Sequence, residues 1–525
     1  NSSTACFWMK QVFHNKGGGG INEGHRGDKW EYFYEFASTG LLNFPIASRR
    51  PLDISTQLDT QASQLRENQP AAILFSERVP TRVILDVARE KSAQLRRLMI
   101  AGQEELDWRC YHLYDLLPIG ITNDDVGHNW PIEISPGERA FEIVLARGIA
   151  TGGDQTTWFE RHGVTPITEI PVHWPEAYRR VVRRRIELIE SDKSIGLIER
   201  PEFKRRWSSP TWEDMEARAL RGWLLDRLEA PELWPASIDL PCHLTSAHRL
   251  ADAVQRDAEF MQVAALYAGR ADFQLPQLIL ELVATESVPF LPVLRYTDSG
   301  LRKREQWEAT WAFQRHEDRI YAEVEAEAPG WREELQLQAE KRFNSATAPD
   351  ALVWIEDQLT KEIARQTVDR KYNEVGQIPA PPKYLSKDFL RSDIWRLRGG
   401  LDVPKERWVS YPGCERGADG SLPIAWAGWD HLQQAMALAS YFIDMKEREG
   451  WGPERLQPLL AGLLELVPWL KQWHNEMNPD FGARMGDYYE SFVNDEARAL
   501  QFTLDDLRAW KPPATAAKRG RKKAA

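Results

Sequence analysis

Cysteine, long apolar runs and familiar catalytic motifs are all scarce in this sequence of 525 residues. The 4 cysteines stand singly, without any Cys-x-x-Cys pair, which excludes a disulfide framework and a structural zinc site of the usual spacing. Such cysteine usage is typical of a reducing compartment, so we expect a cytoplasmic protein. The longest strongly apolar stretch, Pro458–Leu464, is far shorter than the roughly 20 residues of a membrane-spanning helix, and we expect no membrane partner.

Motifs that hold a nucleotide cofactor, a metal or a nucleophile are also missing. The glycines at Gly17–Gly20, Gly24 and Gly27 match neither a Rossmann fingerprint nor a phosphate-cradling P-loop. The sequence contains no Gly-x-Ser-x-Gly elbow and no His-Glu-x-x-His pair. We therefore assign no catalytic, cofactor-binding or metal residue in this chain.

The charge balance limits how the chain can meet nucleic acid. Lys and Arg number 67 and Asp and Glu 78, a net charge of -11, which argues against coating nucleic acid by bulk charge. Any such surface must be local. With 42% hydrophobic and 28% charged residues, the chain has the composition of globular domains, about three by its length. Because it starts at Asn1 rather than Met, we expect it to be a piece of a longer protein.

Helical periodicity dominates the sequence and predicts a mostly α fold with minor short strands in a multidomain helical architecture. The first helix is expected within Asn1–Lys16, and an amphipathic one over Arg82–Ala101. Further helices are expected at Pro175–Ile189, Trp212–Leu228, Ser246–Tyr267, Leu275–Ser287, Leu301–Ala328, Ala351–Tyr372, His431–Glu447 and Pro453–Trp473. The alternation in Lys29–Phe36 predicts a strand, and a brief strand is possible around Trp408 and Val409.

Two stretches rich in turn-forming residues, Pro118–Pro136 and residues 376–383, predict domain boundaries. We expect a helical spacer over 51–118, a helical middle domain with a basic face over 119–375, and a C-terminal helical domain over 376–510. Residues 511–525 hold six basic residues and no acid, which predicts a disordered tail that either rests on phosphates or serves solubility.

The best signal for nucleic acid lies between Arg179 and Arg206, where ten basic residues face five acidic ones. At about 100° per residue, one arc of a helix carries arginines and another carries apolar residues. The predicted phosphate contacts are Arg179, Arg180, Arg183 and Arg184, and we add Lys204 to this set. The alternative is an ordinary solvated face whose arginines pair with neighbouring acids.

A second interpretation of the same region is a metal-dependent nuclease. Asp192, Glu202 and Lys204 could surround a magnesium ion if the fold brings them together. A solvated charged turn explains the same residues without a metal.

Several longer strings resemble a known family. Asn1–Gly20, GDKWEYFYEF (Gly27–Phe36) and LLNFPI (Leu41–Ile46) resemble the segment after the catalytic domain in large adenine-specific DNA methyltransferases. LDWRCYHLYDLL (Leu106–Leu117) is similar to a short helix of the same enzymes. Later strings, including IGLIERPEFKRRW, DVPKERWVSYPGCER and WAGWDHLQQAMALASYF, resemble the C-terminal half of the phage-growth-limitation (PglX-type) methyltransferases of type 2 bacteriophage-exclusion systems.

This resemblance implies that residues 1–50 end a methyltransferase or target-recognition region, and that the parent enzyme methylates adenine N6 of duplex DNA with S-adenosylmethionine. The family's catalytic tetrapeptide and its glycine-rich cofactor motif have no match here, so the cofactor belongs to an upstream domain and we expect this piece alone to be inactive. Lys10, His14 and Lys16 match the family's post-catalytic motif and are expected to contact DNA phosphates, or to cap a helix. The implied partners are double-stranded DNA and other bacteriophage-exclusion proteins. A protein-docking module of the defence complex is the alternative function, and it predicts an exposed apolar patch.

Overall fold

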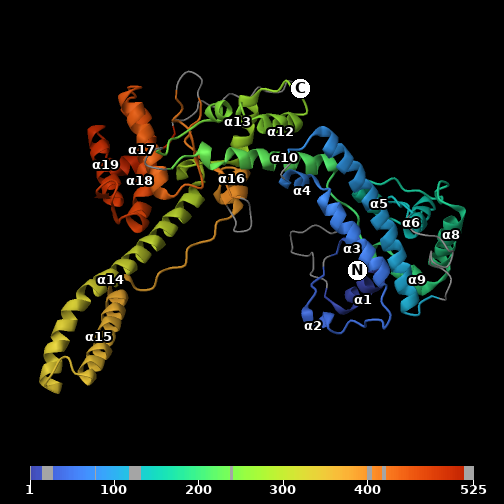
Figure 1. Cartoon of the computed structure of the whole chain (residues 1–525), viewed down its shortest axis with the longest axis horizontal. Coiled ribbons are helices and arrows are strands. Elements are labelled where there is room, and N and C mark those ends of the chain that lie inside the picture. Colours follow the sequence, from blue (N-terminus) through green and yellow to red (C-terminus); the bar gives the residue numbers. More distant parts are fainter. Residues whose placement is uncertain are drawn as a thin grey trace. The chain divides into compact units, whose positions relative to one another are not determined.

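The computed structural model describes residues 2–14, 28–32, 34–76, 79–117, 132–236, 241–398, 405–416 and 421–512 (Figure 1). In these ranges helices dominate and no strand exceeds three residues, which confirms the mostly α fold. The chain forms two compact units, described separately below. Unit 1 comprises residues 1–224 and 262–271, and unit 2 comprises 225–261 and 272–525. The five segments expected from the sequence, with their roles, stay predictions.

Unit 1 is built around one long helix, α5. Its helices are α1 (Ser3–Val12), α2 (Ser38–Leu41), α3 (Leu52–Glu67), α4 (Pro70–Phe75), α5 (Arg82–Leu113), α6 (Ala140–Ala150), α7 (Trp158–His162), α8 (Glu176–Ser191) and α9 (Lys193–Ile198). Two 3-10 turns, η1 (Lys29–Glu31) and η3 (Pro201–Phe203), complete it. Helix α10 (Trp212–Leu228) and helix α12 (Ala258–Ala268) each contribute residues to both units.

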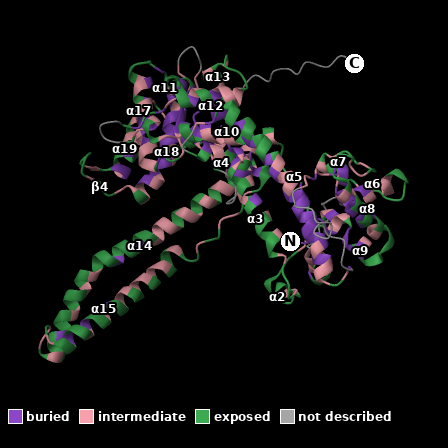
Figure 2. Ribbon diagram, turned by 45° about the vertical axis from the view of Figure 1, so that its right-hand side comes forward, coloured by how far each residue is buried: buried purple, intermediate pink, exposed green. Residues whose placement is uncertain are grey.

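Helix α5 is longer than its amphipathic pattern predicts. The Thr81 hydroxyl accepts a hydrogen bond from the Ile84 N–H and caps its start. Residues 99–108 are all buried, so this half of the helix is covered on every side (Figure 2). A helix buried all round has no one-sided apolar stripe. The pattern therefore ended at Ala101, and Leu106–Leu117 was expected as a separate short helix, whereas one helix continues to Leu113.

The predicted strand over Lys29–Phe36 is wrong, because Lys29–Glu31 forms the 3-10 turn η1. The Asp28 carboxylate accepts hydrogen bonds from the Trp30 indole at 3.0 Å and from the Thr157 N–H at 2.8 Å, which fixes a tight turn. Trp30 is buried edge-on against Trp158 with ring centroids 5.2 Å apart. Trp30 therefore joins the core, whereas Tyr32 and Phe36 stay exposed. The first predicted helix is confirmed as α1.

Unit 2 contains the remaining elements. Its helices are α11 (Ala247–Val254), α13 (Leu275–Glu286), α14 (Asp298–Phe343), α15 (Pro349–Arg370), α16 (Ser392–Arg398), α17 (His431–Glu447), α18 (Pro453–Trp473), α19 (Met485–Ala499) and α20 (Leu504–Arg508). The shorter elements are three 3-10 turns, η4 (Pro231–Leu233), η5 (Pro292–Leu294) and η7 (Ser386–Asp388), and one π-helical segment, η6 (Lys371–Val375). The strands are β1 (Ser287–Pro289), β2 (Trp408–Ser410), β3 (Ile424–Trp426), β4 (Met477–Asn478) and β5 (Ala483–Arg484).

The strands of unit 2 are short links between helices. β2 pairs in parallel with β1, Val409 opposite Val288, and antiparallel with β3, Val409 opposite Ala425. This confirms the brief strand expected around Trp408 and Val409. β4 and β5 form a separate two-stranded hairpin.

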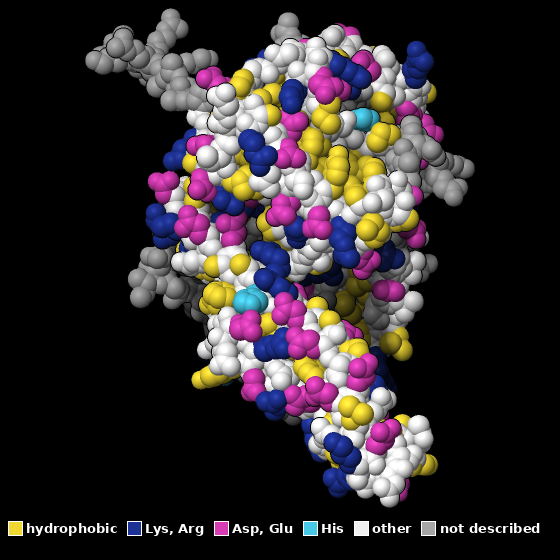
Figure 3. All heavy atoms as spheres, turned by 90° about the vertical axis from the view of Figure 1, so that its left-hand side faces the viewer, with side chains coloured by type: hydrophobic (Ala, Val, Ile, Leu, Met, Phe, Trp, Pro, Cys, Tyr) yellow, Lys and Arg dark blue, Asp and Glu magenta, His cyan; other side chains and the backbone are white. Residues whose placement is uncertain are grey.

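Helices α14 and α15 form an antiparallel hairpin (Figure 1). The sequence predicted that α14 ends at Ala328, before Pro329, but the helix runs on to Phe343. An internal proline removes one backbone hydrogen bond and crowds the carbonyl of the preceding turn, so a helix that continues through it needs support from outside. Ion pairs to α15 on both sides of the proline hold the two halves in line, with Arg370 bonded to Glu327 and Arg332 to Glu356. Figure 3 shows the basic and acidic side chains interleaved along this narrowing lower part.

The helix predicted over Ser246–Tyr267 consists of two helices, α11 and α12. The Asp257 carboxylate accepts hydrogen bonds from the N–H groups of Glu259 and Phe260, at 3.0 and 3.1 Å, and so starts a new helix. The other predicted helices are confirmed as α8, α10, α13, α15, α17 and α18. In the described ranges, no helix combines the length and apolar character that crossing a membrane requires.

Candidate DNA-contacting surface and its buried charge support

Helix α8 carries the predicted arginines and is amphipathic. Tyr178, Val182 and Ile186 are buried, where they pack with residues of α5 and α6 in one core cluster. The opposite side of the helix carries Arg180, Arg183 and Arg184. A helix with one apolar and one basic face buries the first and presents the second to solvent.

The four predicted arginines differ in their surroundings. Arg180, Arg183 and Arg184 are exposed, and the Arg179 side chain is 29% exposed. Glu176 pairs with Arg179 and lies 3.9 Å from Arg183. Arg184 lies 3.0 Å from Glu187. Among the described residues, Arg180 has no carboxylate partner.

These pairs leave the arginines available to other anions. Exposed ion pairs are worth about 0–1 kcal/mol, so an incoming phosphate can displace a glutamate from them. The structure thus places the four arginines on one helix face. It also shows the acidic neighbours expected if this face is only an ordinary solvent-exposed surface.

A fifth arginine of α8 has a different role. Arg185 is fully buried and donates two hydrogen bonds to the Glu105 carboxylate of α5, at 2.8 and 2.7 Å. Its guanidinium also lies over the Trp108 ring, 5.1 Å from the centroid. Such bidentate pairing fixes both distance and orientation. α8 is therefore held on α5 by the residue next to its exposed arginines.

Lys204 does not belong to the exposed basic surface. Its side chain is fully buried, and its ammonium group donates to Glu199 at 2.7 Å and to Asp107 at 3.0 Å, with Glu104 at 3.9 Å. Burial disfavours the lysine charge, but the three carboxylates more than compensate and raise the lysine pKa above its ordinary value. In this structure Lys204 is a core ion-pair partner and is not placed to contact a phosphate.

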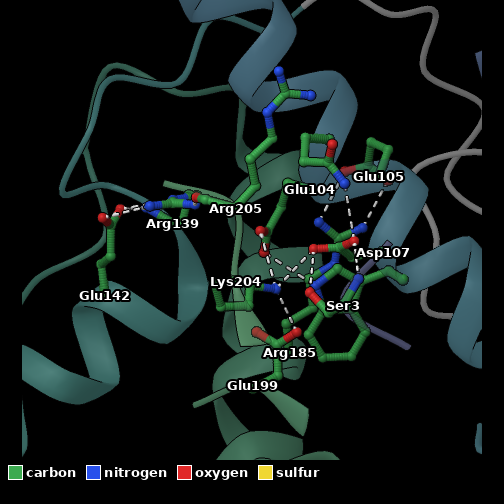
Figure 4. A network of polar contacts seen from close by, with 12 residues as sticks. Ser3, Glu104, Glu105, Asp107, Arg139, Glu142, Arg185, Glu199, Lys204 and Arg205 are labelled. Carbon is green, nitrogen blue, oxygen red and sulfur yellow. Dashed lines mark hydrogen bonds and ion pairs between the residues drawn. The ribbon is translucent and has the colours of Figure 1, made fainter. Parts of the chain in front are cut away.

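We call Lys204, Glu104, Asp107 and Glu199, with Ser3 and Tyr111, the buried charge network (Figure 4). Ser3, at the start of α1, donates from its backbone N–H and its hydroxyl to the two oxygens of Asp107, at 2.8 and 2.6 Å. The Tyr111 hydroxyl donates to Glu199. Burial raises the pKa of Glu199, with Glu104 adding to the effect and Lys204 opposing it. The network joins α1, α5 and the η3 segment.

A second buried pair lies beside the network. Arg139 and Glu142 face each other at 2.8 Å, and the Trp158 indole donates to the same carboxylate at 3.1 Å. Burial opposes the charge of Glu142, but Arg139 lowers the pKa of Glu142 below its ordinary value. Arg139 also donates to the backbone carbonyl of Arg205 at 2.9 Å, while the Arg205 side chain points away from the network (Figure 4).

The remaining basic residues of the segment are exposed. Within the described ranges, Lys193, Arg200, Arg205 and Arg206 have no carboxylate partner. Arg205 lies over the Trp207 ring at 4.5 Å and Arg206 over the Trp30 ring at 5.7 Å. The basic excess seen in the sequence therefore reaches solvent mainly through these residues and the α8 arginines.

The three residues predicted to contact DNA near the N-terminus also differ in their surroundings. Lys10 is partly buried, donates to the backbone carbonyl of Glu202, and lies 5.1 Å from the Tyr34 ring centroid. Burial lowers its pKa. His14 is exposed, and its backbone carbonyl accepts a hydrogen bond from the Glu35 N–H at 3.1 Å. Lys16 lies outside the described residues. Lys10 ties α1 to η3 and does not point freely into solvent.

The nuclease interpretation fails on geometry. Asp192 caps α9 by accepting from the N–H groups of Ser194 and Ile195, at 2.8 and 3.0 Å. Lys204 is directed into the core, where its ammonium group pairs with Asp107 and Glu199 and not with Asp192 or the Glu202 side chain. Within the described ranges, no cluster of three or more His, Cys, Asp or Glu side chains is arranged to hold a metal ion.

Comparisons with known proteins identify the family. Residues 99–523 match a domain of unknown function, DUF7008. The chain belongs to the DUF7008 family. It is also 43% identical over 524 residues to the adenine-specific methyltransferase PglX of Streptomyces coelicolor, covering 99% of this chain and 39% of that protein, its C-terminal part. The chain thus spans well under half the length of this curated relative. No solved structure matches.

The comparison confirms the resemblance stated from the sequence. The DUF7008 match starts at residue 99, where α5 becomes buried on all sides, and it contains every charged side chain of the buried charge network. Ser3 of α1 lies before the match.

Sequence reasoning missed the supporting residues of this DUF7008 chain. Glu104, Glu105 and Asp107 stand beside Trp108 in the half of α5 that is buried on every side. Carboxylates within an otherwise buried stretch indicate buried ion pairs, because a buried charge needs a partner. Their partners Arg185 and Lys204 are about 80 and 100 residues away in sequence, which no local pattern reveals.

Proposed function

We propose that this chain grips and positions duplex DNA, as the C-terminal portion of a phage-defence adenine-N6 DNA methyltransferase. The observation that carries the proposal is the basic face of α8, with Arg179, Arg180, Arg183 and Arg184 in weak surface pairs or in none. The buried Arg185–Glu105 pair anchors that face. Guanidinium groups bind phosphate oxygens through two parallel hydrogen bonds.

The similarity to a methyltransferase supports DNA as the partner and S-adenosylmethionine as the methyl donor of the whole protein. We assign no residue of this chain to that cofactor, because the glycine-rich motif and the catalytic tetrapeptide have no match in the sequence. Isolated, this chain is then expected to be inactive. The proposed setting is the cytoplasm, alongside other bacteriophage-exclusion proteins, and the free thiols of the 4 cysteines support it.

The role of the basic face is tested by measuring binding of the full chain to a DNA duplex across a salt series. In the test variant, Arg179, Arg180, Arg183 and Arg184 are changed to Ala. Each phosphate contact contributes about 0.9 to the slope of log K against log salt, so the slope should flatten by up to about 3.6. A matched control changes four arginines of the α14–α15 hairpin to Ala: Arg319, Arg332, Arg365 and Arg370.

The control should bind like the unchanged chain. Equal slopes for test and control variants would refute the role of the α8 face. If the unchanged chain does not bind DNA at low salt, the gripping role fails for this chain, and docking to other defence proteins becomes the better account. Exposed apolar residues such as Phe75 and Val83 would be the first to examine then.

A further inference from the structure

Unit 2 contains a large cavity between α14 and α18. Its volume is about 1270 Å³, and its walls include Phe290, Arg295, Trp307, Ala461 and Trp469. Small-molecule sites in proteins usually measure about 300–1,000 Å³. The space is therefore ample for a molecule of nucleotide size.

One cation in the wall of this cavity is unusual. Arg295 follows the turn η5 and is 8% exposed. Its backbone is fixed, since its N–H donates to Pro292 at 2.9 Å and its carbonyl accepts from Leu390 at 2.9 Å. Across the described part of the chain, its guanidinium has no carboxylate or hydrogen-bond partner, and its Nε is buried without an acceptor. The guanidinium lies over the Tyr296 ring, 5.4 Å from its centroid.

The charged side chains near Arg295 do not neutralise its positive charge. Burial and the positive charge of Arg398 lower the pKa of Arg295 to about 10, with Arg304 adding to the effect and with Tyr296 and Glu465 opposing it. Both neighbours already have partners, Arg398 with Glu406, and Arg304 with Glu465 and Glu308.

The other carboxylates of the wall are also accounted for. Glu490 pairs with Lys471 at 2.7 Å, and Glu305 is exposed to solvent. An unpaired buried charge costs several kcal/mol unless a counter-ion meets it. A cavity that keeps such a cation at its wall is suited to an anionic ligand.

Flat aromatic side chains line the same cavity. The rings of Tyr296 and Tyr384 stack at 5.2 Å, and Trp307 is nearly parallel to Tyr384 with centroids 6.5 Å apart. The Trp307 indole donates to the Pro382 carbonyl at 2.9 Å, which fixes its orientation. Aromatic surfaces of this kind pack against purine and pyrimidine rings.

We propose that this cavity binds a free nucleotide, whose phosphate pairs with Arg295 and whose base packs against the aromatic wall. A phosphate next to a base also occurs in nucleic acid strands. The position of Arg295 favours a free nucleotide, because the residue is 8% exposed and lies at the cavity wall, where a small ligand fits and the backbone of a rigid duplex does not. This inference concerns unit 2 and does not depend on the proposed role of the α8 arginines.

The test uses the full chain and three probes in calorimetric titrations: AMP, adenosine and inorganic phosphate. AMP should bind saturably and more tightly than either part alone. Arg295→Met should weaken AMP binding by about tenfold or more, because it removes a charge-assisted hydrogen-bond pair. Arg295→Lys, which keeps the charge but loses the planar fork, should bind with intermediate affinity. The matched control, Arg498→Met, changes an arginine on the surface of unit 2 that is 79% exposed and should leave binding unchanged.

A thermal scan separates a ligand role from a structural one. Without ligand, Arg295→Met should melt at the same temperature as the unchanged chain or higher, because it removes an unpaired buried charge. AMP should raise the melting temperature of the unchanged chain but not that of the variant. The proposal is overturned if Arg295→Met binds AMP normally, if it melts earlier without ligand, if phosphate binds as tightly as AMP, or if a short DNA duplex displaces AMP.

Discussion

Arg185 of α8 and Glu105 of α5 form a fully buried bidentate ion pair, with nitrogen–oxygen distances of 2.8 and 2.7 Å. The two residues stand 80 positions apart in the chain. Their pairing sets how α8 lies on α5, and so where the neighbouring Arg180, Arg183 and Arg184 face solvent. The support of the candidate surface is thus a pair of charges inside the core.

Removing one partner of this ion pair should destabilise the fold more than replacing both partners together. Arg185→Met or Glu105→Gln alone leaves one buried charge without its partner, and each should lower the free energy of unfolding by about 3–5 kcal/mol. The double variant should lose less than the sum of the two single variants. Urea denaturation of the four proteins measures the coupling. Additive losses would show that the two side chains do not act as a pair.

The buried charge network predicts a pH effect at Glu199. Burial raises its pKa in the folded chain above the ordinary value of 4.5, so the folded state binds more protons than the unfolded state once the pH exceeds about that value. The stabilisation linked to this proton is complete below pH 4.5 and is lost as the pH rises through the folded-state pKa.

Glu199→Gln replaces the carboxyl group with a neutral amide, which resembles the protonated form of Glu199. It should reduce the fall in stability as the pH rises above about 4.5, because the amide has no proton to lose there. Thermal melting across this range measures the effect, with the exposed Glu187→Gln of the same unit as control. A variant that is destabilised more at pH 8 than at pH 5 would contradict the sign.

Glu176 should restrain the proposed DNA surface. It pairs with Arg179 and lies 3.9 Å from Arg183, so Glu176→Gln frees two arginines and removes one negative charge. DNA affinity at low salt should rise several-fold, and the gain should shrink as salt increases. Glu213→Gln, which frees Arg89 of α5 instead, is the control. Unchanged affinity would argue that phosphates do not reach this part of α8.

Gly300 near the start of α14 should not tolerate a side chain. A Cβ there would lie 2.1 Å from the Asp388 carbonyl oxygen and 2.9 Å from the Tyr296 Cβ. Gly300→Ala should therefore cost about 1–3 kcal/mol of unfolding free energy. Gly330→Ala in the same helix meets nothing within 4 Å and should instead stabilise by about 0.5–1 kcal/mol. Thermal denaturation of both variants tests this prediction, and equal shifts of the two melting temperatures would contradict it.

The sequence by itself determined the helical class, most helix positions, the basic character of the α8 region and the family resemblance. These follow from local periodicity, from local charge and from strings of residues, all of which can be read along the chain. The same local patterns predicted that Lys204 lies at the surface and that Lys29–Phe36 forms a strand. Only the tertiary structure decided those points, because burial depends on contacts between distant segments: Lys204 meets Asp107, and Trp30 meets Trp158. The same holds for Arg295, whose lack of a partner is a property of the folded cavity and has no counterpart in the pattern around it.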